Sequence, residues 1–155
     1  MSSPTEPSLE LILTRDIPVS PEKLFQTWHQ RLQEWWAPKP LTTPVCEVDF
    51  RPGGAFKTLM RDPEGTEYPA CGIFLDIEKG SRIVLTDAYD AGWKPNPAIF
   101  FTAVITFDPL PDGGTRYTAR ALHWTEENCK KHKEMGFHEG WAQCLDQLIE
   151  IAKQN

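Results

Sequence analysis

The sequence has no long hydrophobic run and no excess of positive charge. No segment approaches the roughly 18 consecutive apolar residues that span a membrane, and no secretory signal pattern opens the chain. The formal net charge is -6, with 16 Lys and Arg against 22 Asp and Glu. Nucleic acids and anionic membrane surfaces attract basic proteins. We therefore expect a cytoplasmic protein that binds neither nucleic acid nor membrane.

Closely spaced cysteines are also absent. Cys46, Cys71, Cys129 and Cys144 include no Cys-x-x-Cys pair. Structural zinc sites usually contain such pairs, and disulfide-rich secreted domains are shorter and denser in cysteine. We expect four reduced thiols, most of them buried, and no bound metal.

The chain lacks recognisable motifs for cofactor binding and nucleophilic catalysis. Arg51-Pro52-Gly53-Gly54 has paired glycines, but it lacks the lysine and the following helix of a phosphate-binding loop. No Ser-His-Asp spacing or nucleophile elbow stands out. We therefore expect no cofactor.

What is present suits one soluble domain. The chain has 155 residues, of which 40% are hydrophobic and 25% charged, enough for a core without disulfide or metal staples. The polar segment Met1–Ser8 contains two prolines and predicts a short disordered tail, so the domain is expected over residues 9–155.

A strand and one or two short helices are predicted first. Leu9–Arg15 alternates as a strand does. Ser20 is placed to cap a helix that has Pro21 at its first position. The apolar stripe of this helix ends at Trp35 and Trp36, because the prolines that follow prevent continuation.

Six further strands are predicted between residues 45 and 123. They are Val45–Arg51, Ala55–Arg61, Cys71–Glu78, Arg82–Tyr89, Ile99–Phe107 and Thr115–His123. Ile73, Leu75 and Ile77 alternate on one face, and Asp90–Pro97 is expected to be a loop. Short turns between successive strands favour an antiparallel meander.

The last thirty residues predict one long amphipathic helix from Trp124 to Gln154. Its apolar stripe consists of Phe137, Trp141, Cys144, Leu145, Leu148 and Ala152. Thr125 is placed to cap it. Gly136 and Gly140 lie on one edge of the stripe, and each disfavours a helix by about 0.5–1 kcal/mol relative to alanine. Such glycines indicate a bend, or the close approach of a strand or a ligand.

The fold class follows from this order of elements. An antiparallel sheet must cover its apolar face, and the C-terminal helix is the only predicted element long enough to do so. We therefore expect an α+β protein in which a curved sheet of about six to seven strands grips one long helix.

The motif Asp49-Phe50-Arg51-Pro52-Gly53-Gly54-Ala55-Phe56 resembles the sheet-entry motif of the START-like (SRPBCC, Bet v-type helix-grip) superfamily. More narrowly, the chain resembles homologues of the activator of the heat-shock-protein-90 ATPase. The similarity continues through Trp35-Trp36, Gly65, Gly72, Arg82–Thr86, Gly114-Thr115 and His132 to Met135–Trp141. It implies the helix-grip fold with a cavity between sheet and helix. Family members mostly bind hydrophobic or aromatic small molecules there, while some are enzymes and one activates a chaperone.

Aromatic residues are the candidate lining of such a cavity. Trp35, Trp36 and Trp93 lie at element ends or in a loop, where a cavity mouth is expected. The other candidate ligand-binding residues are Phe56, Met60, Phe101, His123, Phe137 and Trp141. Packing of the same aromatics as ordinary core is the competing interpretation.

Two histidines are candidate polar groups. His123 shares a face with Tyr117 and is a weak candidate for an acid or base; its alternative role is a hydrogen bond to the start of the helix. His132 projects to the polar side of a continuous helix. Glu134 and His138, four residues apart, are expected to form a helical pair rather than a metal site.

The remaining polar candidates favour structural roles. Asp49 and Arg51 alternate onto one outward face and are expected to pair, and Asp87 is placed to join them. Cys144 has no neighbouring cation to lower its thiol pKa, so it is expected to be core filler rather than a reactive thiol.

Three functions remain open from the sequence. The preferred one is a carrier, sensor or sequestering protein for a small apolar or aromatic molecule. A module that contacts a chaperone is the second, and an enzyme that uses His123 is the third, although binding is favoured over catalysis. The sequence is compatible with a monomer or a homodimer.

Overall fold

The computed structural model describes residues 9–97 and 99–154. Its main sheet contains β1 (Glu10–Ile17), β2 (Thr42–Val48), β3 (Ala55–Arg61), β4 (Glu67–Glu78), β5 (Arg82–Thr86), β8 (Phe101–Pro109) and β9 (Thr115–His123). The helices are α1 (Pro21–Gln30), α2 (Leu32–Trp35), α3 (Glu126–Glu134) and α4 (Phe137–Gln154). The predicted tail Met1–Ser8 lies outside the described residues.

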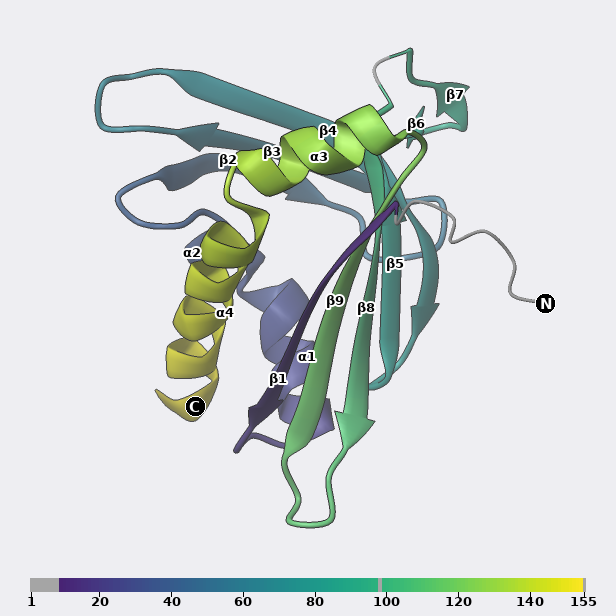
Figure 1. Ribbon diagram of the computed structural model, residues 1–155. Helices are drawn as coiled ribbons and strands as arrows, with labels where there is room; N and C mark the ends of the chain where they lie inside the picture. Colours follow the sequence, from purple (N-terminus) through teal and green to yellow (C-terminus); the bar gives the residue numbers. More distant parts are fainter. Residues whose placement is uncertain (1–8, 98, 155) are drawn as a thin grey trace, which may run out of the picture.

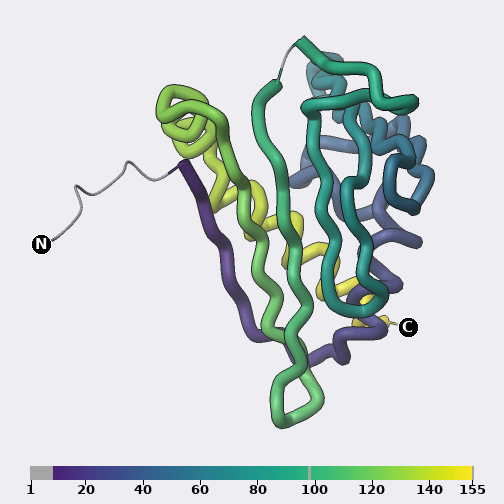
Figure 2. The backbone as a smooth tube through the Cα atoms, turned by 90° about the vertical axis from the view of Figure 1, so that its right-hand side faces the viewer, coloured from purple at the N-terminus to yellow at the C-terminus, as the bar shows by residue number. Residues whose placement is uncertain are grey.

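The seven strands form one antiparallel sheet in the order β1-β9-β8-β5-β4-β3-β2. The sheet curves around the helices (Figure 1). Figure 2 looks at the other face of the sheet, where α4 passes behind the central strands. The predicted helix-grip fold class is therefore confirmed. Within the described residues, no helix is both long and apolar enough to cross a membrane.

Local capping explains where two of the helices begin. The Ser20 side chain accepts a hydrogen bond from the backbone N–H of Lys23, and Pro21 occupies the first turn of α1, as predicted. Thr125 caps α3 in the same way, through the backbone N–H of Asn128. Both caps satisfy backbone donors that have no partner inside a helix.

Several strand predictions differ from the structure; for example, β2 ends at Val48 and β5 at Thr86, before the predicted ends. Leu75 does not share a face with Ile73, because a bulge in β4 interrupts its register with β5 and leaves the Leu75 side chain exposed. Ile99 lies outside β8 and is also exposed. The predicted loop Asp90–Pro97 contains part of a small separate hairpin, formed by β6 (Tyr89–Asp90) and β7 (Lys94–Pro95).

The prediction of one continuous C-terminal helix is wrong. Helix α3 ends at Glu134, and Gly136 adopts a φ of +92° before α4 begins at Phe137. Backbone N–H groups of Met135 and Gly136 bond to carbonyls of the last turn of α3, which is a common glycine termination. The predicted Glu134–His138 pair is therefore split between two helices.

The main core lies between α4 and the sheet. Leu145 and Leu148 on α4 are fully buried together with Phe107 on β8 and Tyr117 on β9. Leu24 and Trp28 on α1 close the same core at one end. Burial of such side chains is the main term that stabilises the packing of α4, at about 1.5–3 kcal/mol for each large apolar side chain.

The two helix glycines give a matched test of this architecture. Gly136→Ala is expected to destabilise the protein by about 1–2 kcal/mol, because a Cβ strains the left-handed conformation at this residue. Gly140→Ala is expected to stabilise it by about 0.5 kcal/mol, because a Cβ at Gly140 meets no atom within 4 Å and alanine favours the helix. Urea unfolding measures both changes. Equal changes in the free energy of unfolding for the two substitutions would contradict a helix end at Gly136.

Candidate functional site

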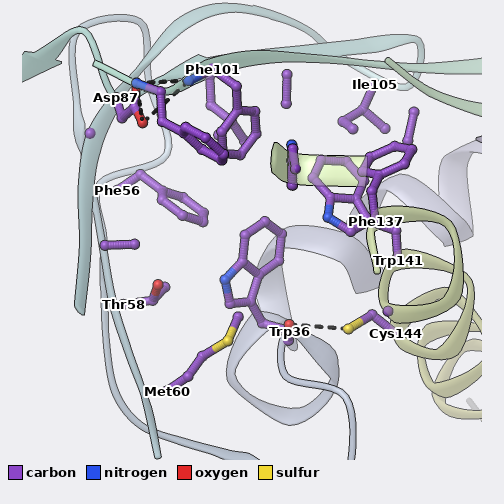
Figure 3. A pocket seen from close by; sticks show the side chains of 18 of the residues that line it. Trp36, Phe56, Thr58, Met60, Asp87, Phe101, Ile105, Phe137, Trp141 and Cys144 are labelled. Carbon is purple, nitrogen blue, oxygen red and sulfur yellow. Dashed lines mark hydrogen bonds between the residues drawn. The ribbon is translucent and has the colours of Figure 1, made fainter. Parts of the chain in front are cut away.

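A cavity of about 570 Å³ lies between the concave face of the sheet and α4. This volume falls within the range of about 300–1,000 Å³ that is typical of sites for small organic ligands. Aromatic and aliphatic side chains make up most of its walls (Figure 3). Exposed residues at its rim, including Tyr68 and Met135, mark where it meets the surface.

The structure brings seven of the nine predicted ligand-binding residues to this cavity. They are Trp35, Trp36, Phe56, Met60, Phe101, Phe137 and Trp141. Trp93 and His123 are not among the lining residues. The ring of Trp93 is 57% exposed and lies beside Gly53 and Tyr89.

The aromatic walls are held by contacts among the rings and with the backbone. Trp36 lies between Phe56, at a centroid distance of 5.0 Å, and Cys144 of α4, whose thiol donates to the Trp36 carbonyl (Figure 3). Phe137 and Trp141 pack at 4.6 Å on the opposite wall. The indole N–H of Trp35 donates to the Trp28 carbonyl, so it is already satisfied.

His123 and His132 form a buried hydrogen-bonded pair, of which only His132 lines the cavity. His123 Nδ1 lies 2.9 Å from the Leu9 carbonyl oxygen, and His123 Nε2 lies 2.9 Å from His132 Nδ1. The alternative prediction for His123, a hydrogen bond to the start of the helix, is wrong in its partner, because His132 lies in the last turn of α3. The predicted position of His132 on the polar side of the helix, solvated or packed on a loop, is wrong, because the residue is only 7% exposed and lines the cavity.

The hydrogen bonds fix the proton positions in the neutral pair. A carbonyl oxygen only accepts, so His123 carries its proton on Nδ1, and His123 Nε2 accepts from His132 Nδ1–H. His132 Nε2 is then a lone-pair acceptor. Burial, with a smaller contribution from His123, lowers the pKa of His132 to about 4, so it stays neutral at pH 7.

Asp87 is the acidic side chain of the cavity lining. Its carboxylate accepts backbone hydrogen bonds from Phe100 and Phe101 at 3.0–3.4 Å. Asp87 and Phe101 lie side by side in Figure 3. Burial raises the pKa of Asp87, although these N–H groups oppose the shift. Asp87 therefore does not join the exterior ion pair of Asp49 and Arg51, which forms as predicted at 2.7 Å.

Thr58 contributes an unsatisfied polar atom to the β3 wall. The residue lines the cavity and is 2% exposed, and its buried Oγ1 has no hydrogen-bond partner among the described residues. A buried hydroxyl without a partner disfavours folding by about 1–3 kcal/mol. Buried side-chain oxygens without a partner are rare in native proteins, and this one belongs to a residue of the cavity wall.

The described residues contain no cluster of metal ligands, and their buried thiols are not activated. No group of three or more His, Cys, Asp or Glu side chains in residues 9–97 and 99–154 is arranged to hold a metal ion. The four thiols are free, but only Cys129 and Cys144 are buried, and Cys71 is exposed. Burial raises the pKa of Cys144 to about 12, which fits the predicted core filler.

Thr58 and His132 are the polar residues that the sequence prediction missed. Thr58 had a usable signal, since it alternates between Phe56 and Met60 on one strand face. His132 belongs to the family resemblance, but helical periodicity placed it on the polar side, and only the break at Gly136 turns it toward Phe137. Asn96 and Met135 also line the cavity from segments without a repeating pattern.

Comparison with known proteins agrees with this fold. The family model described as "Activator of Hsp90 ATPase homolog 1-like protein" matches residues 18–153. The crystal structure of a Nitrosomonas europaea protein is 41% identical, with a TM-score of 0.89, over 94% of this chain and 95% of that one. The comparison with curated proteins gives no match.

More distant structures share the fold. A Mycobacterium smegmatis protein is 24% identical, with a TM-score of 0.77, over 92% of this chain and 90% of that one. A Silicibacter pomeroyi protein whose structure carries the same family name is 23% identical, with a TM-score of 0.64, over 94% and 99% of the two chains.

Titration of His132 is expected to make stability depend on pH. The unfolded chain binds a proton at this residue near pH 6.5, but the folded protein does so only near pH 4. The free energy of unfolding therefore falls as pH decreases between these values, by at most about 1.4 kcal/mol per pH unit from this group. Above pH 6.5 the contribution of His132 is constant.

The matched control is His132→Asn, because the Asn amide reaches the position of Nδ1 and keeps the donor to His123 without titrating. Urea unfolding at pH 7.5, 6.0 and 5.0 measures the pH dependence of both proteins. The wild type is expected to lose more stability than the variant between pH 6 and 5. Parallel losses would show that His132 does not carry the assigned shift.

Proposed function

The chain belongs to the family of activator of Hsp90 ATPase homolog 1-like proteins, and we propose that it binds a small hydrophobic or aromatic molecule in its central cavity. The observation that carries this proposal is the 570 Å³ cavity with aromatic walls. Its role is that of a carrier, a sensor or a sequestering protein. This proposal involves binding without catalysis, like the function preferred from the sequence.

The cavity walls suit a small organic ligand because most of their side chains are apolar and only a few are polar. Trp36, Phe56 and Trp141 offer ring faces and edges from separate elements. Aromatic contacts of this kind contribute about 0.5–1.5 kcal/mol each beyond area burial. A planar ligand between these rings gains contact with the residue that follows α2, with β3 and with α4 together.

Catalysis by His123 has weaker support. Both ring nitrogens of His123 are engaged, with Leu9 and His132, and the residue does not line the cavity. A group that transfers a proton must reach the reacting atom directly or through one water. The binding function therefore accounts for more of the geometry than the acid–base function does.

Occupation of the cavity can be tested with N-phenyl-1-naphthylamine, a neutral probe whose fluorescence rises in apolar surroundings. The wild type is expected to bind it with an increase in emission. Gly140→Leu is expected to weaken binding at least about tenfold, since Gly140 lines the cavity and has open space around its Cβ position.

Gly140→Ala is the matched control and is expected to keep the wild-type affinity within about twofold, because one methyl group fills little of the cavity. Circular dichroism checks that both variants fold. Absence of any binding by the wild type would refute the proposed function. Equal affinity in all three proteins would place the probe elsewhere.

An exposed aromatic pair favours a second candidate function, contact with a chaperone. Tyr89 and Trp93 pack at 5.8 Å on the β6–β7 hairpin, which projects from one end of the sheet, and Trp93 is 57% exposed (Figure 1). Exposed aromatic groups are enriched at protein interfaces. On this candidate, the chain stimulates the ATPase of the cognate Hsp90-type chaperone, and Trp93→Ser removes the stimulation without affecting probe binding. No stimulation by the wild type would exclude it.

A further inference from the structure

We propose that the cavity prefers aromatic molecules that carry a neutral hydroxyl group, with His132 Nε2 accepting a hydrogen bond from that hydroxyl. This inference rests on the proposed binding function and specifies the chemical class of its ligand. Four features support it: the order of hydrogen bonds through the histidine pair, the aromatic surroundings of His132, the unpaired hydroxyl of Thr58 and the charges that line the cavity.

The order of hydrogen bonds makes His132 an acceptor. The Leu9 carbonyl takes the Nδ1 proton of His123, so His123 Nε2 takes the Nδ1 proton of His132. A neutral imidazole has one proton, so Nε2 of His132 keeps its lone pair. No described residue bonds to that nitrogen, and the His132 ring lines the cavity. The molecule that meets it must therefore bring a donor.

The surroundings of His132 keep it neutral and favour an aromatic partner. Its ring lies 5.0 Å from those of Phe100 and Phe101, 5.2 Å from Phe137 and 6.0 Å from Trp141. These rings leave His132 only 7% exposed, and this burial lowers its pKa, which favours the neutral imidazole. A donor placed among these rings belongs to a molecule whose remaining surface is apolar.

Thr58 supplies a second polar point on the β3 wall. The residue lines the same cavity, and its buried Oγ1 lacks a partner among the described residues. A hydroxyl both donates and accepts, so Thr58 can bond to a second oxygen on the ligand once a rotation about χ1 turns Oγ1 toward the cavity. The two polar points come from different elements, α3 and β3, which favours a ligand that spans the cavity.

The charges of the lining disfavour anionic ligands. The cavity is lined by no Lys or Arg among the described residues, and Asp87 adds an acidic group. A carboxylate ligand loses its hydration there without gaining a cation, and it meets the lone pair of His132. Aromatic acids should therefore bind more weakly than the corresponding phenols.

Three matched probes test the preference: 2-naphthol, 2-methylnaphthalene and 2-naphthoate. Equilibrium dialysis at pH 7 gives a dissociation constant for each with the full chain. In the wild type, 2-naphthoate is expected to bind at least about tenfold more weakly than 2-naphthol, because its charge stays unpaired. The ratio of the 2-methylnaphthalene constant to the 2-naphthol constant then measures the contribution of the hydroxyl.

His132→Asn and His132→Gln separate the two nitrogens. Asn keeps the donor at the Nδ1 position but removes the acceptor that faces the ligand, so the ratio is expected to fall about three- to tenfold. Gln places an amide near the Nε2 position and is expected to retain at least half of the wild-type ratio. Thermal unfolding checks that each variant is folded before dialysis.

The outcomes distinguish this inference from the function on which it rests. Binding of 2-methylnaphthalene with a ratio unchanged in His132→Asn would overturn the hydroxyl preference and leave the apolar cavity function intact. Equal affinity for 2-naphthoate and 2-naphthol would also overturn it. Failure of both neutral probes to bind, together with failure of N-phenyl-1-naphthylamine, would overturn both proposals.

Discussion

The left-handed turn at Gly136 is the constraint on which the cavity depends. Its φ of +92° ends α3 and lets α4 begin in another direction. Helix α3 then lies across one end of the sheet while α4 lies against its concave face (Figure 1). On a continuous helix His132 and Phe137 point to nearly opposite sides; here their rings are 5.2 Å apart. One backbone conformation therefore places the polar group on the cavity wall.

The histidine pair joins the pieces that this turn separates. Through Leu9, His123 and His132, hydrogen bonds run from the segment before β1, through β9, to α3. Because the pair is buried, loss of either ring leaves the other with an unsatisfied nitrogen, which is expensive in a low-dielectric interior. The same chain of bonds holds α3 in place and sets which atoms offer a lone pair. The same hydrogen bonds therefore determine both where His132 lies and which of its nitrogens accepts a hydrogen bond.

Most of the fold was predictable because it depends on local patterns. Alternation located the strands, and Ser20 and Thr125 marked helix starts through their capping bonds. The aromatic walls followed from the same faces. The prediction put His132 on the wrong side of the helix because it did not recognise the helix end at Gly136. The sequence alone does not distinguish a glycine that a helix tolerates, such as Gly140, from one that ends a helix, such as Gly136. That difference is decided by packing against the sheet, which no local pattern records.

The walls also explain why the cavity persists instead of collapsing. Trp35 and Trp36 are tied through hydrogen bonds at the indole N–H and the backbone carbonyl, and Phe137 and Trp141 pack on each other across from them. The indole bond of Trp35 and the ring contacts of Trp36, Phe137 and Trp141 oppose rotation of these rings into the space. Wall atoms that face the cavity lack protein neighbours on that side and so forgo dispersion contacts. A molecule of complementary shape restores those contacts, so its binding energy and the stability of the folded protein are linked by mass action.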